Sequence, residues 1–548
     1  MSTAPVLAGV TSPLTPEERR DTSYQKRVTA ANLDKAKALP AENNNGDDDR
    51  YAASNHYASH GKGLPHNNFG EVDPAAYGAL LQALQTGAPS DFDAIPLGWP
   101  DKSKQYKLTD PQAGLAYDLE CPDCQSYAMP APPTFRSEEE IGEIAENYWM
   151  ALTRDIPFVS YKDHPLISAA AADLSKYAVF NGPKSGGAVT PGTVFRGFTK
   201  GDQAGPYLSQ FLLRDVPYGS QLTPATVKFG FKSNADYLTD PAEWLDVQKG
   251  KDPGLNPESI DDPFHLINGR QLAHYVHIDE LFQAYLNACL ILITPVNRGG
   301  FNAPLDEGNP YKGYVPSSHA ARYSNQAGFG TLGEPNFKGM VAEIATRALK
   351  AAWFQKWYVN RRLRPEAFAG RIHHQLLSGR SYEFNSTEFS KLQSDVLGRI
   401  FTASGNKSYL LPMAYPEGCP LHPAYAAGHA TVAGACVTIL KAIFYEDALL
   451  SDLGVPVMEP SADGKNSQPY MGADKNSLTI GGELNKLAGN IGLARNVAGV
   501  HWRSDYTQSL LLGERIALDF LRETISTYNE NVTFTVRRFD DTVVTITK

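Results

Sequence analysis

The sequence has little of three features that would place it in other classes of protein. Five cysteines in 548 residues are too few for a disulfide framework. The longest apolar runs, such as LNACLILITPV, are too short to cross a bilayer, and the first residues lack the cationic start and apolar core of a signal peptide. A formal net charge of -10 disfavours nucleic acids and anionic membranes as partners. We therefore expect a soluble protein, cytoplasmic or of a compartment that the sequence does not reveal, with no nucleic-acid or membrane partner.

What is present is the pattern of a mainly helical protein. Hydrophobic residues make up 42% of the chain and charged residues 20%, as in ordinary globular proteins. Residues 1–70 are polar and predict an extended or partly disordered N-terminal arm, whereas residues 71–548 predict a single helical domain. Apolar residues at three- and four-residue spacing predict helices over the ranges 75–87, 137–155, 269–293, 339–363, 429–450, 481–499 and 505–524. The period-two alternation of residues 532–548 predicts a small C-terminal β-hairpin.

The first candidate motif, KWYVNRRLRP, carries Lys356 and Arg364. Pro365 disfavours helical geometry at the preceding residue, so the helix is expected to end at Arg364. The two cations stand eight residues apart, and they reach one pocket only if the chain turns there. The alternative is a basic helix end, because cations are favoured near the negative pole of the helix dipole.

The second motif, HPAYAAGHAT, places Gly428 and His429 at the start of an alanine-rich helix. The first N–H groups of a helix have no partner inside the helix and point at any bound anion. Glycine also lets such an anion approach the backbone closely. The alternative is a buried, hydrogen-bonded histidine that happens to lie at a helix start.

The third motif, ARNVAGVHWRSD, places Arg495 and His501 at the junction of two helices. Gly499 breaks the first helix, and Asp505 is predicted to cap the second or to orient one of the cations. Together the three motifs supply a lysine, two arginines, two histidines and a helix-start N–H group. A tetrahedral oxyanion with a reactive axial position requires this set of groups. We therefore predict an oxyanion cage in the C-terminal half of the chain.

Two further patterns predict metal sites less strongly. Cys121 and Cys124 form a lone CxxC, which is half a zinc site, a redox pair or simply two loop cysteines. His274 and His277 share a helical face and could hold a metal together with Glu280. Ordinary surface and core histidines are the alternative, because nothing else in the sequence completes such a site.

The three cationic motifs, written K-x7-R-P, x-G-H and A-R-x5-H-x3-D, resemble those of the vanadium-dependent haloperoxidases. This family is related to the type 2 phosphatidic acid phosphatases and to the bacterial class A acid phosphatases. The likeness to the red-algal type of vanadium bromoperoxidase extends over most of the chain, through segments such as GKGLPHNNFGEVDP, DLECPDCQSYAMPAPP and GTVFRGFTKGDQAGPYLSQ. The resemblance implies a mainly α fold of two four-helix bundles with long loops. It also implies a large homo-oligomer, with a dodecamer as one form.

The resemblance also implies a vanadate cofactor, V5+, and the residues that hold it. His501 would bind vanadium through its imidazole, opposite an axial hydroxide or water. Cations and one backbone N–H group would hold the equatorial oxygens, and the cofactor-binding set is Lys356, Arg364, Gly428, His429, Arg495 and His501. His429 would act as acid–base toward hydrogen peroxide and Lys356 would polarise the peroxide. The catalytic set is therefore His429, Lys356 and His501.

Three positions bear on the halide and on cofactor affinity. His422 is similar to a histidine placed near the halide in the bromoperoxidases. Trp353 is the second candidate halide residue, and it stands where the red-algal enzymes carry arginine, as an aromatic residue does in the chloroperoxidases. Ala427 replaces the usual serine before Gly–His, which removes one hydroxyl contact to vanadate.

The implied activity is that of a haloperoxidase. Hydrogen peroxide would oxidise bromide or iodide, with chloride as a further candidate, to a hypohalous acid that halogenates small organic nucleophiles. One alternative is an acid phosphatase with His501 as nucleophile and His429 as general acid. Another is a non-enzymatic phosphate-binding protein. Calcium is a second candidate cofactor, in the loop APLDEGNP that carries Asp306 and Glu307.

Overall fold

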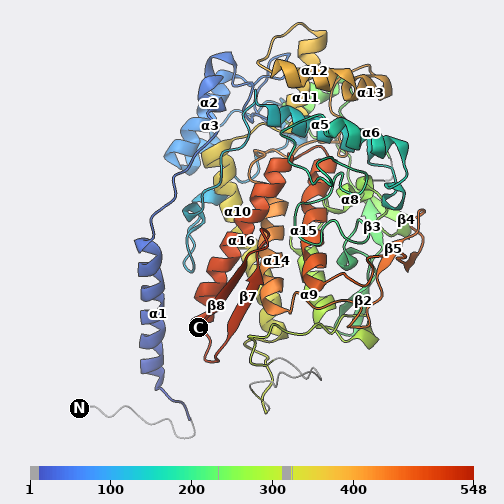
Figure 1. Ribbon diagram of the computed structural model, residues 1–548. Coiled ribbons are helices and arrows are strands. Elements are labelled where there is room, and N and C mark those ends of the chain that lie inside the picture. Colours follow the sequence, from blue (N-terminus) through green and yellow to red (C-terminus); the bar gives the residue numbers. More distant parts are fainter. Residues whose placement is uncertain (1–10, 232–233, 312–322, 324) are drawn as a thin grey trace.

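The computed structural model describes residues 11–231, 234–311, 323 and 325–548, and their fold is mainly helical (Figure 1). Within these residues, sixteen α-helices alternate with long loops and four two-stranded antiparallel sheets. None of the described helices is long and apolar enough to cross a membrane. The predicted fold class, a mainly α protein of helical bundles with long loops and a small C-terminal hairpin, is confirmed.

Four helices form the centre of the molecule: α10 (Glu334–Phe354), α14 (Gly428–Ile443), α15 (Ile480–Val497) and α16 (Arg503–Ile525). α14 packs against the other three and lies among them (Figure 1). All of its residues except His429 are buried, because small and apolar side chains dominate every side of it. α14 and α16 approach closely at two glycines. A β-carbon at Gly434 would meet the carbonyl oxygen of Leu510 at 2.1 Å, and one at Gly513 would meet that of Thr431 at 2.0 Å.

A second group of helices covers one end of this centre (Figure 1): α5 (Glu138–Thr153), α6 (Pro165–Leu174), α11 (Pro365–Leu377), α12 (Ser386–Ser394) and α13 (Val396–Ala403). α5 packs against each of the other four and also against α15. Glu140, Glu143 and Glu146 follow one face of α5 at three-residue spacing, and all three are buried. Buried carboxylates require cationic or hydrogen-bonding partners, so this face of α5 must meet such groups on other elements.

The remaining elements are shorter or lie at the periphery. The other helices are α1 (Pro16–Ala36), α2 (Asp47–Arg50), α3 (Pro74–Thr86), α4 (Pro89–Asp93), α7 (Pro241–Gln248), α8 (Gly269–Tyr275) and α9 (Gln283–Ile293). The strand pairs are β1 (Val216–Tyr218) with β2 (Gln221–Thr223), β3 (Val227–Gly230) with β4 (Glu258–Phe264), β5 (Met458–Pro460) with β6 (Ser467–Pro469), and β7 (Thr533–Arg537) with β8 (Val543–Thr547). The predicted hairpin is β7–β8, in the register Thr533↔Thr547, and it lies beside α14 and α16.

Two of the predicted helices are interrupted. The helix predicted over 269–293 is two helices, α8 and α9, and Asp279 lies in the break. The helix predicted over 339–363 passes from α10 into a π-helical turn, η8 (Gln355–Asn360). That turn ends at Arg361, whose φ of 38° is left-handed. The apolar spacing continues through both breaks, so periodicity alone predicts neither of them.

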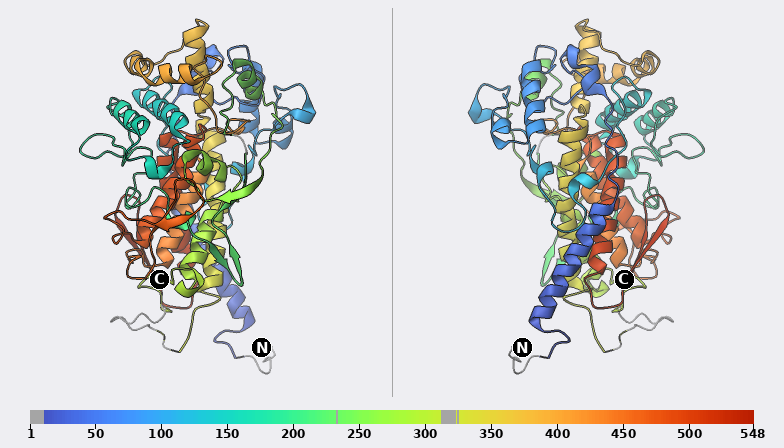
Figure 2. Two further views of the ribbon diagram at one scale, coloured as in Figure 1. Left: turned by 90° about the vertical axis from the view of Figure 1, so that its right-hand side faces the viewer. Right: turned by 90° about the vertical axis from the view of Figure 1, so that its left-hand side faces the viewer.

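The N-terminal segment is more structured than the expected extended or partly disordered arm. Residues 16–36 form α1, which begins with a capping box: the Thr15 side chain accepts from the N–H of Glu18, and the Glu18 carboxylate accepts from the N–H of Thr15. α1 buries none of its residues and stands to one side of the helical body (Figure 1), and its N-terminal end extends below the body in the turned views (Figure 2). The boundary predicted at residue 70 stays a prediction.

The chain after α1 packs against η8 rather than extending away from it. Asp48 accepts a hydrogen bond at 2.5 Å from Nε of Arg361. The N–H of His60 donates to the carbonyl oxygen of Arg361. Lys62 forms a buried ion pair at 2.9 Å with Glu366 in the first turn of α11. The N-terminal region therefore contributes directly to the support of the segment that carries Lys356 and Arg364.

Candidate functional site

Three segments that are far apart in the sequence meet at the end of the central helices nearest α5 and α11 (Figure 1). They are the junction of η8 with α11, the loop leading into α14, and the turn between α15 and α16. This meeting point brings together the predicted site residues Trp353, Lys356, Arg364, His422, Gly428, His429, Arg495 and His501.

Arg364 makes more hydrogen bonds than the other members of the cage. It is the N-cap residue of α11 and has an extended backbone, with Pro365 in the first turn, so the chain turns here as predicted. Its buried guanidinium donates to the carbonyl oxygens of His422 and Val500. It also lies 2.9 Å from Nδ1 of His422 and 3.1 Å from Nε2 of His501. Burial lowers the pKa of Arg364 to about 10, so its charge is kept at neutral pH.

Lys356 lies on η8 with its ammonium group fully buried. Nζ donates to the carbonyl oxygens of Pro423 at 2.8 Å and Ala424 at 3.2 Å. No carboxylate among the described residues forms an ion pair with it. Burial, and then the charge of Arg364, hold the pKa of Lys356 well below its usual value. An anion placed beside Lys356 would reverse this effect and favour the charged ammonium group.

The start of α14 presents backbone N–H groups that have no acceptor. Ala427 is the N-cap residue, and its methyl side chain cannot accept a hydrogen bond. In the described part of the chain, the N–H groups of Gly428, His429 and Ala430 donate to no acceptor. The N–H of Ala427, in contrast, donates to Oγ of Ser509 at 2.7 Å. A buried helix start with unused N–H groups is a favourable position for an anion.

His501 lies in the turn between α15 and α16, and Asp505 fixes its proton. Nδ1 of His501 lies 2.8 Å from Oδ2 of Asp505. A carboxylate at Nδ1 keeps the proton on that nitrogen and leaves Nε2 unprotonated. Burial, and then the charge of Arg364, hold the pKa of His501 well below its usual value. The ring is therefore neutral, and the lone pair of Nε2 is available to a metal.

The predicted capping role of Asp505 needs a correction. Trp502, and not Asp505, is the N-cap residue of α16. Asp505 occupies the third helical position, from which Oδ2 reaches back to accept the N–H of Trp502 at 3.0 Å. The same oxygen accepts from His501, so one carboxylate both closes the helix start and orients the imidazole.

Arg495 closes the cage from the side of α15. Its Nη1 donates to the hydroxyl of Tyr415 at 3.2 Å and to the carbonyl oxygen of Val276 at 3.3 Å. Its Nε is buried and has no acceptor among the described residues. Arg495 thus adds a third positive charge and an unused donor beside Lys356, whose pKa it lowers further.

His429 is the one residue of α14 that is not fully buried. Its Nε2 lies 3.1 Å from Oδ1 of Asp279, in the break between α8 and α9. The Asp279 side chain is itself only 4% exposed, so the pair is shielded from bulk water on one side. If Nε2 carries the proton that Asp279 accepts, Nδ1 is the basic atom of His429.

The two predicted halide residues lie next to each other at the edge of the cage. The rings of Trp353 and His422 are 4.9 Å apart between centroids, with a tilt of 40°. The Trp353 ring also lies 5.5 Å from Nζ of Lys356, and a β-carbon at Gly428 would meet it at 3.1 Å. Burial, and then the charge of Lys356, hold the pKa of His422 well below its usual value, so this ring is neutral.

The donors of this site fit a bound oxyanion. Three cations converge, one of them with an unused buried donor, and a helix start adds N–H groups without acceptors. The Nε2 atom of His501 faces the same space and would be able to ligate the metal of a bound metal oxide. A helical-bundle fold with this arrangement of donors defines a protein suited to hold an oxyanion beside a histidine.

Comparison with known proteins gives the family. Residues 342–530 match the family model described as the VCPO second helical-bundle domain. The chain is 35% identical to a vanadium-dependent bromoperoxidase of Corallina pilulifera, over 97% of this chain and 99% of that protein. It is 33% identical to one of Ascophyllum nodosum, over 97% and 93% of the two chains. The structure of a second vanadate-dependent bromoperoxidase from Ascophyllum nodosum, a homohexamer, superposes with a TM-score of 0.88 at 27% identity and covers 100% of this chain and 94% of that chain. The chain belongs to the vanadium-dependent bromoperoxidases.

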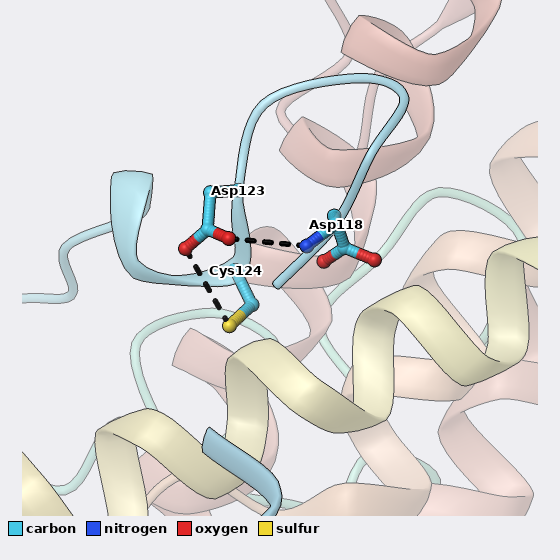
Figure 3. Close-up of side chains that lie close together, drawn as sticks. All are labelled: Asp118, Asp123 and Cys124. Carbon is cyan, nitrogen blue, oxygen red and sulfur yellow. Dashed lines mark hydrogen bonds between the residues drawn. The ribbon is translucent and has the colours of Figure 1, made fainter. Parts of the chain in front are cut away.

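The lone CxxC does not form a metal centre in the described structure. Asp118, Asp123 and Cys124 lie close together (Figure 3), and Cys121 is not part of the group. Asp118 is already paired with Lys350, and its N–H donates to Asp123 at 3.1 Å. Burial raises the pKa of Cys124 to about 12, so its thiol is protonated. These groups satisfy one another without an ion, and we assign them no metal or redox role.

His274 in α8 and His277, which follows that helix, do not form a metal site either among the described residues. His274, His277 and Glu280 do not come together closely enough to share an ion in the described part of the chain. His277 instead lies 2.5 Å from Glu417 through Nε2, and its ring packs 4.2 Å from that of Tyr415. The structure therefore agrees better with the alternative, in which these histidines contact other protein groups and hold no metal.

Sequence reasoning missed three residues that support the site. Asp279 was hidden inside a segment whose apolar spacing predicts an unbroken helix. Arg362 was passed over as part of a basic helix end, and Lys62 lay in the segment expected to be an arm. The three arginines of RRLRP were an available signal, because an arginine that becomes fully buried is almost always paired with an acidic residue.

Proposed function

We propose that this chain uses vanadate, held in the cage, to oxidise bromide and iodide with hydrogen peroxide to a hypohalous acid that halogenates small organic nucleophiles. The observation that carries the proposal is that Nε2 of His501 faces buried cations, and that none of these cations forms an ion pair with an acidic residue in the described part of the chain. When bound, vanadate would supply a Lewis acid that makes hydrogen peroxide electrophilic toward halide.

The cage residues would bind vanadate by replacing contacts that they now make with one another. Nε2 of His501 would ligate vanadium in place of its contact with Arg364. The guanidinium groups of Arg364 and Arg495, the ammonium group of Lys356 and the N–H of Gly428 would then donate to the oxygens. Lys356 would also polarise the bound peroxide, because its Nζ has a third N–H beyond the two that the carbonyl oxygens accept.

His429 would move the proton of hydrogen peroxide. Nδ1 would take the proton, and Asp279 on Nε2 would stabilise the charged imidazole that results. This role requires that Nδ1 of His429 is free to accept a proton when hydrogen peroxide arrives.

His422 and Trp353 would form the halide side of the site. Their neutral, adjacent rings border the cage and offer apolar contact to a polarisable anion. The full-length relatives support the haloperoxidase over both the acid phosphatase and the phosphate-binding alternatives.

Calcium binding near Asp306 and Glu307 stays a separate prediction. Asp306 is buried, its carboxylate accepts the N–H of Gly308 at 3.0 Å, and burial raises its pKa to about 6. These contacts support a role in holding the loop, and calcium titration followed by thermal unfolding would test whether an ion adds to it.

We also propose that the protein forms a homo-oligomer in which residues 1–70 contact neighbouring subunits. The similar Ascophyllum nodosum protein is a homohexamer. α1 buries no residue within its own chain, whereas most of the stability of a protein helix comes from packing against other elements. Light scattering would distinguish a hexamer from the dodecamer predicted by resemblance.

Reconstitution tests the function directly. The purified protein should bind orthovanadate and then brominate a cyclic dione in the presence of hydrogen peroxide and bromide, with no activity when vanadate is withheld. The same assay with chloride and iodide would establish the halide range. Hydrolysis of a phosphate ester without vanadate, and no peroxide-dependent bromination with it, would contradict the proposal.

A further inference from the structure

Arg362 sits at the centre of a buried charge cluster behind the cage. Its guanidinium is only 2% exposed. Nη2 donates to the carboxylates of Glu140 and Glu143 on α5. Nη1 donates at 2.7 Å to Oδ1 of Asp505 and at 2.7 Å to Oγ of Ser504 on α16. One cation therefore joins η8, α5 and α16 beneath the site.

The two oxygens of Asp505 are divided between Arg362 and the histidine. Oδ1 accepts from Arg362, whereas Oδ2 accepts from Nδ1 of His501 at 2.8 Å and from the N–H of Trp502 at 3.0 Å. Arg362 also stacks over the Trp502 ring, 5.0 Å from its centroid. Arg362 thus lies one carboxylate away from the imidazole without touching the cage itself.

Asp505 needs this partner because of where it lies. Its side chain is fully buried, and a buried carboxylate without a cationic partner is costly. Without Arg362, Oδ1 would lose the guanidinium that holds it, and the carboxylate could turn away from its present orientation. Nδ1 of His501 would then lose its acceptor, and the ring could rotate away from the cage.

We propose that Arg362 is a positioning residue for the vanadate-binding histidine: it holds Asp505 in the orientation in which Oδ2 accepts from Nδ1 of His501, so that Nε2 of the ring points into the cage. The proposal rests on the proposed function, because it concerns the ligand of that same cofactor. It assigns Arg362 no contact with vanadate, peroxide or halide.

Arg503 provides a matched control. It is also buried, lies one residue after Trp502, and forms an ion pair with Glu146 on the same acidic face of α5. It donates to the carbonyl oxygen of Arg196 and makes no hydrogen bond to Asp505 or His501. Arg503→Lys should therefore perturb the same helix interface as Arg362→Lys without acting on the histidine.

The experiment compares the two variants by orthovanadate binding and by thermal unfolding of the vanadate-free protein. We expect Arg362→Lys to raise the vanadate Kd by about 10–100-fold, as partners of metal ligands typically do, while Arg503→Lys shifts the unfolding temperature similarly and leaves the Kd within about twofold of the original protein. Equal changes in Kd for both variants, or an unchanged Kd for Arg362→Lys, would overturn the proposal.

A double-mutant cycle with Asp505→Asn separates positioning from general structural damage. If Arg362 acts through Asp505, Arg362→Lys should weaken vanadate binding little further once Asp505 is Asn. Additive losses would overturn the proposal, and if Asp505→Asn does not fold, the comparison with Arg503→Lys decides alone. Failure of the unmodified protein to bind orthovanadate would instead contradict the proposed function itself.

Discussion

His501 and Asp505 lie one helical turn apart at the start of α16, with 2.8 Å between Nδ1 and Oδ2. This contact settles which nitrogen of the imidazole faces the cage, because a carboxylate on one side leaves the other side without a proton. The rest of the site is arranged around that one nitrogen, and the first prediction follows from it.

His501→Ala should abolish stable vanadate binding and all halide oxidation, because the alanine side chain offers no nitrogen in place of the Nε2 that is proposed to ligate vanadium. His429→Ala should still bind vanadate but oxidise bromide about 10²–10⁴-fold more slowly, as expected for loss of an acid–base group. Equilibrium dialysis with orthovanadate and a bromination assay measure the two effects. Full bromination by either variant would remove the role assigned to that residue.

Ala427→Ser should strengthen vanadate binding. The position is buried at the start of α14, where the added hydroxyl lies beside N–H groups that have no acceptor. A serine there can donate to the oxyanion, and one such bond corresponds to about 1 kcal/mol, or roughly a fivefold lower Kd. Ala427→Gly, which adds no hydroxyl, is the control, and equal vanadate affinity for the serine and glycine variants would count against the prediction.

Trp353→Arg should change halide kinetics more than cofactor binding. The ring packs on His422 and near Lys356, so an arginine would add a positive charge where a halide is proposed to approach. We expect a severalfold lower KM for bromide with a vanadate Kd within about twofold of the original. Trp353→Phe keeps the aromatic contact and controls for packing. A bromide KM that is the same in both variants would contradict the assignment of this position.

Asp202→Asn should stabilise the protein at neutral pH. Asp202 is buried, its Oδ2 has no partner among the described residues, and burial raises its pKa to about 6. The folded state therefore holds the proton more tightly than the unfolded chain does. The free energy of unfolding therefore falls by about 3 kcal/mol in total as the pH rises from about 4 to about 6.

Asparagine carries no charge, so Asp202→Asn should match the original protein near pH 4 and exceed it above pH 6. Oδ1 of the asparagine can still accept the N–H of Gly197, which the carboxylate accepts at 3.1 Å. Urea unfolding at several pH values measures the difference. A constant difference across this range would show that Asp202 does not titrate as its burial implies.

Removal of residues 1–41 should dissociate the proposed oligomer without unfolding the subunit. α1 buries no residue in its own chain, and its described bond to the body is a single one, from Lys26 to the carbonyl oxygen of Ser526. Light scattering should therefore report a smaller assembly while the unfolding temperature changes by only a few degrees. Lys26→Ala tests the contact to the body alone, and an unchanged assembly after the truncation would exclude α1 as an interface.

The sequence predicts most of the helices and the members of the cage, but not the direction in which each arginine points. The sequence predicts one basic helix end for the three arginines of RRLRP, yet each has a different partner in the structure. Arg361 contacts Asp48, Arg362 contacts the glutamates of α5, and Arg364 points into the cage. The left-handed backbone at Arg361 divides them, and no feature of the spacing indicates it. The hydrogen bond between Asp279 and His429 is missed for a similar reason, because helical periodicity reports local burial and not a contact between distant segments.

The packing of residues 47–72 on η8 and α11 limits how far the chain can be truncated from its N-terminus while the site keeps its support. A fragment starting after residue 72 would keep every group proposed to touch vanadate, yet Arg361 and Glu366 would lose Asp48 and Lys62 and be left as uncompensated charges in the interior. Shortened versions intended for practical use should therefore be cut before Asp47, even though the chemistry resides hundreds of residues downstream.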